Sequence, residues 1–265
     1  MRTDSRASRV AVVGRRGFRV AIWAIRHHPD CASNANELDC WDCPTLCARL
    51  AAEWLRAVRL HPRSAVFENA YHFLRRYNPA LCVRMLLAAE RRDASEPWRW
   101  AFRVALVIRG SAGPSAERDA DRRALPFLRR AVASASGNRR LAMTPPLART
   151  ARRVGEVDLA RRVLEETLQS FPIPDMSLHT GTVVRFQLHT EFALLELTHG
   201  DPGAAARHVR EAVALSPPRR RGELDELARV AAEKLGFEAA LQLGLNPGRS
   251  EASAGQAQGP TTEES

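Results

Sequence analysis

Apolar residues recur every three or four positions along almost the whole chain after residue 44, which is the spacing of one face of an α-helix. The first stripe runs through Leu46, Leu50, Trp54 and Val58 and stops before Pro62, because proline disfavours helical geometry in the preceding residue. No segment shows the apolar–polar alternation of a half-buried strand. With two tyrosines and few β-branched runs, the chain has little material for a sheet. The sequence therefore predicts an all-α fold.

Cap and turn residues divide this pattern into a series of helices. Ser64 is suited to an N-cap, Pro97 to a first helical position, and the small residues from Gly110 to Asp119 to a loop. The predicted helices cover residues 46–58, 64–77, 81–89, 97–110, a stretch containing Ala124, Leu128, Ala131 and Val132, and then 146–154, 157–170, 178–198, 203–214, 222–235 and 237–243. Residues 244–265 lose the periodicity at Asn246, which predicts a disordered C-terminal tail.

Two stretches share a spaced pattern of four residues. A glycine is followed five positions later by alanine, four positions after that by a larger apolar residue, and seventeen positions after the glycine by proline. The two sets are Gly155, Ala160, Leu164 and Pro172, and Gly200, Ala205, Val209 and Pro217. Earlier, Cys82 with Leu86 and Leu50 with Trp54 occupy the same small and large positions. Small residues let two helices cross closely, and the larger residue fills the space beside the crossing.

This pattern resembles the tetratricopeptide repeat family, whose units are helical hairpins. The resemblance covers residues 44–217 in degenerate units, and the 45 residues between Gly155 and Gly200 imply an insertion in a repeat of about 34. It implies a right-handed α-α superhelix of stacked hairpins over residues 44–243.

The same resemblance implies a function without catalysis. In stacks of tetratricopeptide-like hairpins, the first helix of each hairpin lines a groove that holds a peptide or protein partner. In this chain the frame places Tyr71, Arg75, Arg149, Arg152 and Arg153 near that face. Since arginine pairs bidentately with carboxylates, the expected partner is an acidic segment.

Four of the five cysteines lie close together, at Cys31, Cys40, Cys43 and Cys47. Cys40 and Cys43 have a chelating spacing, so a zinc or iron–sulfur site, or a redox-responsive regulatory role, is an alternative function. Against it, only one such pair is present, and unligated thiols in an N-terminal helix and loop over residues 1–43 are the simpler interpretation. Cys82 fits a packed core position.

The formal charge of +10 comes almost entirely from arginine. A nucleic-acid-binding function is therefore a second alternative, although abundant arginine and alanine are also typical of a GC-rich bacterial genome, which makes nucleic acid the less favoured partner. No signal peptide or membrane span is evident, so we expect a cytoplasmic protein. No phosphate loop, nucleophile motif or HxxxH pair appears, so we expect no enzyme and no resident cofactor.

Overall fold

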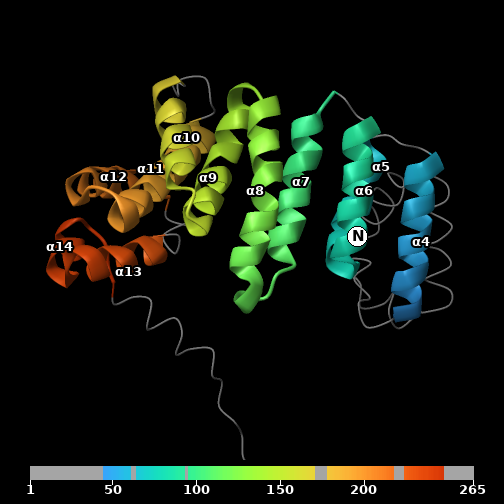
Figure 1. Ribbon diagram of the computed structural model, residues 1–265, viewed down its shortest axis with the longest axis horizontal. Helices are drawn as coiled ribbons and strands as arrows, with labels where there is room; N and C mark the ends of the chain where they lie inside the picture. Colours follow the sequence, from blue (N-terminus) through green and yellow to red (C-terminus); the bar gives the residue numbers. More distant parts are fainter. Residues whose placement is uncertain (1–43, 61–63, 93–94, 171–177, 218–223, 248–265) are drawn as a thin grey trace, which may run out of the picture. The chain divides into compact units, whose positions relative to one another are not determined.

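The computed structural model describes residues 44–60, 64–92, 95–170, 178–217 and 224–247 (Figure 1). Its eleven α-helices in these ranges are α4 (Pro44–Leu60), α5 (Ser64–Tyr77), α6 (Pro79–Arg92), α7 (Pro97–Gly110), α8 (Glu117–Ser134), α9 (Gly137–Val154), α10 (Val157–Ser170), α11 (Leu178–His199), α12 (Pro202–Leu215), α13 (Leu224–Leu235) and α14 (Phe237–Gln242). A 3₁₀ turn, Pro114–Ala116, precedes α8. The described residues contain no strand, which confirms the predicted all-α fold.

The helices form two compact units. The repeat pattern in the sequence does not predict this division. One contains α4 to α8 and ends at Ser134, and the other starts at Ala135 and contains α9 to α14. Within each unit, helices that follow one another in sequence pack together as hairpins, except that α13 packs on α11 and α14 rather than on α12. We call α5, α7, α9, α11 and α13 first helices, and the others second helices.

The core of the first unit lies where α5, α6 and α7 meet. Phe67 and Trp100 are fully buried, with ring centroids 5.6 Å apart, and thus join the two first helices α5 and α7. Leu74 and Leu86 are also fully buried. Burial of each large side chain contributes roughly 1.5–3 kcal/mol, so these contacts fix how the hairpins stack.

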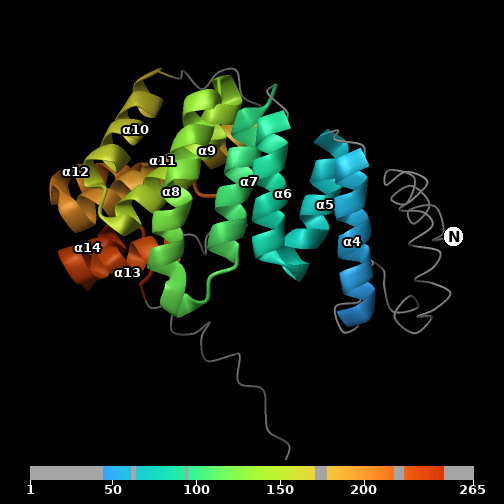
Figure 2. The same ribbon diagram turned by 45° about the vertical axis from the view of Figure 1, so that its right-hand side comes forward.

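The second unit is built around α11, which packs against α9, α10, α12 and α13 (Figures 1 and 2). Every residue from Thr190 to Leu197 is buried, whichever side of the helix it occupies. A helix that is apolar on all sides needs neighbours on all sides. The 22-residue length of α11 lets it serve as the centre of this unit.

Three of the four repeat pairs found in the sequence are fully buried in the core, whereas in the fourth Leu50 is buried but Trp54 is only half-buried. The small residues Cys82, Ala160 and Ala205 are all 0% exposed, and so are their large partners, Leu86, Leu164 and Val209. Closely packed helical pairs explain why only small residues fit at the first set of positions. This burial confirms the stacked-hairpin packing.

The two repeat glycines serve different physical purposes. Gly155 ends α9 with a left-handed φ of 91°, and its N–H donates to the carbonyl of Arg152 while that of Glu156 donates to Ala151. This is a Schellman cap, which favours glycine. Gly200 instead leaves room for a side chain, because a Cβ there would lie 1.7 Å from Oε2 of Glu196.

One predicted boundary is wrong. Helix α9 begins at Gly137, nine residues before the predicted start at 146, and continues through Pro145 and Pro146. Proline in a helix interior costs about 3 kcal/mol. Buried Leu141 and Met143, which lie before the prolines, offset that cost through packing.

The predicted N-terminal helix and cysteine loop of residues 1–43 lie outside the described residues, as does the predicted tail from residue 248 onward. The stretch 244–247 is described and follows α14 as a turn. None of the described helices combines the length and the apolar character needed to cross a lipid bilayer.

Candidate interaction surface

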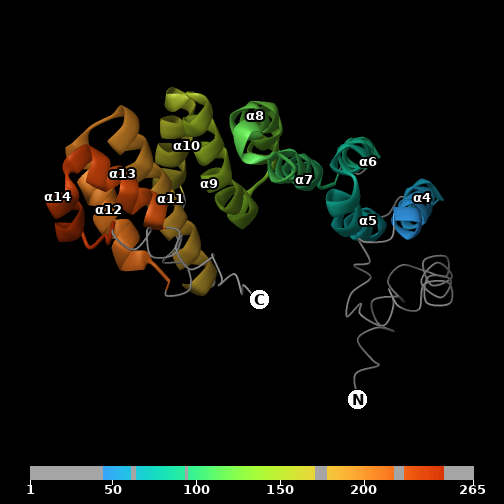
Figure 3. The ribbon, with the colours of Figure 1, turned by 90° about the horizontal axis from the view of Figure 1, so that it is seen from below.

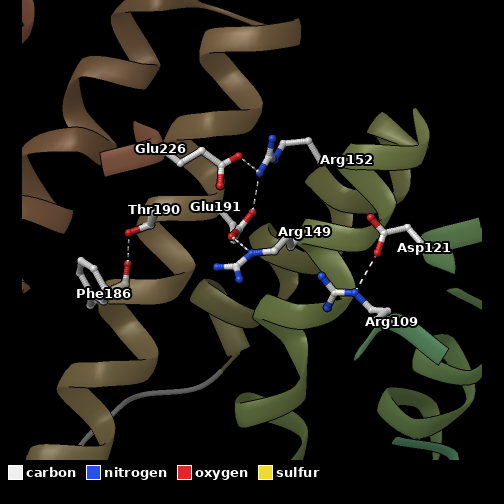
Figure 4. A network of polar contacts seen from close by, with 8 residues as sticks. All are labelled: Arg109, Asp121, Arg149, Arg152, Phe186, Thr190, Glu191 and Glu226. Atoms are coloured by element: carbon white, nitrogen blue, oxygen red, sulfur yellow. Dashed lines mark hydrogen bonds and ion pairs between the residues drawn. The ribbon is translucent and has the colours of Figure 1, made fainter. Parts of the chain in front are cut away.

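In the second unit, a buried carboxylate links three first helices. Glu191 on α11 is 1% exposed and accepts from Arg149 Nε at 2.5 Å and from Arg152 Nη2 at 3.2 Å, both on α9 (Figure 4). Arg152 also lies 3.3 Å from Oε1 of Glu226 on α13. Because each helix contributes charge to the same network, it fixes the register of the three helices.

The network changes the interpretation of two predicted binding residues. Arg149 and Arg152 do lie on the first-helix face, as the repeat frame predicts, but each has an acid partner inside the chain. The side chain of Arg152 is only 8% exposed, so a partner's carboxylate would have to displace a buried ion pair to reach it. Arg153, the third predicted arginine of α9, is exposed.

In the first unit, two arginine side chains lie against one aromatic ring. Tyr71 on α5 is 1% exposed, and the guanidinium carbons of Arg75 and Arg103 lie 5.4 Å and 4.4 Å from its ring centroid. These are cation–π distances. Arg103, on α7, also pairs with Glu68 on α5, so the ring and the carboxylate together join the two helices. Tyr71 is thus a support beneath the arginines rather than a contact surface itself.

Arg75 differs from the other arginines of this site. It is exposed, and no carboxylate among the described residues pairs with it. Arg103, which lies over the same ring, and Arg99 are about 30% exposed and share Glu68, and Arg99 also pairs with Glu96. The ring of Tyr71 holds the Arg75 guanidinium against the surface, where it can meet an external anion at a reduced entropic cost.

The predicted cysteine cluster is only partly described. Cys31, Cys40 and Cys43 lie outside the described residues, and Cys47 is buried in α4. No group of three potential metal-ligating side chains occurs in the described part of the chain. Metal binding by this cluster stays a prediction.

Cys82 is a packed core thiol, as predicted. It is fully buried on α6, and its Sγ lies 4.0 Å from the carbonyl oxygen of Tyr71. Burial raises the pKa of the thiol to about 12. A thiol with so high a pKa is a poor nucleophile, so Cys82 contributes packing.

Comparison with protein-family models, curated proteins and solved structures found no match to this chain. The family resemblance therefore stays a prediction that rests on the repeat positions.

Sequence reasoning missed a pair of facing histidines. Nδ1 of His189 on α11 lies 3.0 Å from Nδ1 of His208 on α12, and the His208 ring stacks on Phe192 at a centroid distance of 4.2 Å. The two residues are 19 positions apart on different helices, so no short motif could reveal them. Hairpin register is needed to bring them together.

Sequence reasoning also missed the acid partners of the arginines. Glu191 interrupts the apolar run of α11, and a carboxylate in such a run needs a buried partner. That signal was available, although it does not identify Arg149 and Arg152 as the partners. In the first unit, Asp121 is similarly 2% exposed and accepts from Nε of Arg109 at 2.8 Å (Figure 4).

Proposed function

We propose that the protein is a non-catalytic helical scaffold that binds an acidic segment of a partner protein through the first helices α5 and α7. The observation that carries the proposal is the exposed guanidinium of Arg75, which rests on the buried Tyr71 ring without an acid partner among the described residues. The tetratricopeptide-like spacing supports the same use of first helices. Abundant arginine and alanine favour a bacterial source, and the proposal places the protein in the cytoplasm.

The charge arrangement supports an acidic rather than a basic partner. Arg103 lies over the same Tyr71 ring as Arg75, and the nearby carboxylates of Glu68 and Glu96 already pair with Arg99 and Arg103. A carboxylate of the partner could pair with Arg75 and gain a charge-assisted hydrogen bond of roughly 1.5–3 kcal/mol. The buried tyrosine beneath would exclude water from one side of that pair.

The test is recovery of partners from the native host with tagged full-length protein. Arg75→Glu should lose a specific protein partner that the wild type retains, because the substitution reverses the exposed charge at this site. Arg56→Glu, on an exposed position of α4, carries the same change in charge and should retain the partner.

A result in which both variants recover the same proteins as the wild type would contradict the proposal. Loss with both variants would point to net charge rather than to this site. Recovery of nucleic acid, rather than of a protein, with the tagged wild type would support the alternative of nucleic-acid binding.

A further inference from the structure

The first unit carries a groove on its second helices, which involves none of the residues around Arg75. It has a volume of about 380 Å³ and lies along α4 and α6. Figure 3 shows these two helices nearly end-on, both beside α5. The residues that line it are Leu55, Val58, Arg59, Leu81, Arg84, Met85, Leu87, Ala88, Arg91 and Arg92. Six of these ten are apolar and four are arginine, so the groove has an apolar floor and a cationic rim.

The rim arginines are available to an external anion. Arg59, Arg84, Arg91 and Arg92 are all exposed, and none is paired with a carboxylate among the described residues. Three of them occupy the last turn of a helix, where a cation also offsets the helix dipole. Arg84 lies in the middle of α6, where the dipole gives no such advantage. Interaction with the helix dipole therefore does not account for all four arginines of the rim.

The floor presents apolar surface that the unit does not cover completely. Val58 and Met85 are buried, whereas Leu55, Leu81 and Leu87 are only half-buried. Apolar surface beside four exposed arginines favours a ligand that supplies both apolar groups and negative charge.

The spacing of the rim indicates a chain with several acids. Arg84 and Arg91 are seven residues apart on α6, which is about 10.5 Å along the helix axis. A ligand with a single anionic group reaches one of them at a time. Carboxylates two turns apart on a partner helix repeat at the same distance, while its apolar side chains enter the floor.

We propose that the groove between α4 and α6 binds an acidic amphipathic helix of a partner protein. The apolar side of that helix lies on Leu55, Leu81 and Leu87, and its flanking carboxylates pair with the arginines of the rim. The proposal does not depend on the site at Arg75, because the two surfaces use different helices.

The probe is a fluorescein-labelled peptide of about 18 residues, made of glutamate and leucine, with the leucines at helical spacing on one face. Its binding to the full-length protein is measured by fluorescence anisotropy. A peptide of the same composition in scrambled order should bind at least about tenfold more weakly, because it keeps its charge but loses the apolar face.

Matched variants separate the groove from general attraction to a basic protein. The double variant Arg84→Glu, Arg91→Glu should weaken binding at least about tenfold. The double variant Arg56→Glu, Arg122→Glu changes the charge equally at exposed positions outside the groove and should bind within about twofold of the wild type. Circular dichroism checks that each variant remains folded.

A third variant tests the floor without changing the charge. Ala88 is half-buried in the groove, and Ala88→Phe should fill part of it and weaken peptide binding about tenfold.

Several results would overturn the proposal. One is equal loss of binding in the two arginine double variants, and another is unchanged binding in Ala88→Phe. Binding to phosphatidylglycerol vesicles through Arg84 and Arg91, with no binding of the peptide, would assign the groove to a lipid surface instead. None of these outcomes bears on partner recovery through Arg75.

Discussion

At the scale of single residues, the surroundings of a guanidinium decide what it can bind. Arg152 is buried beside two glutamates, whereas Arg75 is exposed over a tyrosine ring. Loss of one partner from a buried pair costs about 3–5 kcal/mol, but an exposed cation–π contact contributes about 0.5–1 kcal/mol. Arginines on first helices thus stabilise the fold through a buried ion pair in one unit and are exposed in the other.

The histidine pair predicts a loss of stability in acid. Burial lowers the pKa of His208 to about 4, assisted by the nearby His189 and Arg207 and opposed by Glu196 and Glu211. The pKa of His189 is also lowered, first by burial, with Arg185 and Arg207 acting in the same direction and Glu211 against it. With Nδ1 atoms 3.0 Å apart, one ring must donate and the other accept, so a second proton between them is unfavourable.

Since the folded pKa lies below the unfolded value of about 6.5, this stability is present above pH 6.5 and is lost as the pH falls toward 4. Urea denaturation should show a loss on the order of 2 kcal/mol from about pH 7 to about pH 5. His208→Phe should reduce this dependence, and His199→Asn, at an exposed position, should preserve it. An identical pH dependence in His208→Phe and wild type would show that the pair does not cause it.

At the scale of helices, α9 shows packing overriding a local preference. Pro145 and Pro146 cannot donate to the carbonyls one turn earlier. The Thr144 hydroxyl donates to the Arg140 carbonyl at 3.0 Å and thus adds a local hydrogen bond. Continuous helix is retained because both halves carry buried apolar residues.

This arrangement predicts that one proline is replaceable with a gain in stability. Pro146 is half-buried, and Pro146→Ala should raise the free energy of unfolding by about 1 kcal/mol, because a helical N–H is restored. Pro202 occupies the first position of α12, where no intrahelical bond is lost, so Pro202→Ala should give no gain. Urea denaturation compares the two, and equal gains would refute the explanation.

Helix positions were predictable because apolar spacing reports directly which face is buried. The predicted 97–110 and 157–170 coincide with α7 and α10, whereas the start of α9 does not, since a proline pair reads locally as a boundary. The site was less predictable. The repeat frame placed Arg75 and Arg152 on first helices, but only tertiary packing shows which of them has an internal carboxylate.

At the scale of the molecule, both compact units contain arginines that pair internally, such as Arg109 with Asp121 in the first unit. In the second unit, buried Glu191 pairs with Arg149 and Arg152. In the first, Arg75 and the groove arginines have no acid partner among the described residues. Part of the positive charge of the described residues is therefore exposed and has no internal acid partner there.

All five tryptophans precede residue 101, so tryptophan fluorescence follows only the first unit, whereas circular dichroism follows both. The two signals therefore allow a direct test of the difference between an internally paired arginine and an exposed one. Urea denaturation of Arg152→Glu and Arg75→Glu, followed by both signals, compares an arginine with an internal partner and one without.

Arg152→Glu should lower the stability seen by circular dichroism by about 3 kcal/mol or more and leave the fluorescence transition in place. Arg75→Glu should lower it by less than about 1 kcal/mol. Equal losses in the two variants, or a larger loss for Arg75→Glu, would contradict the account.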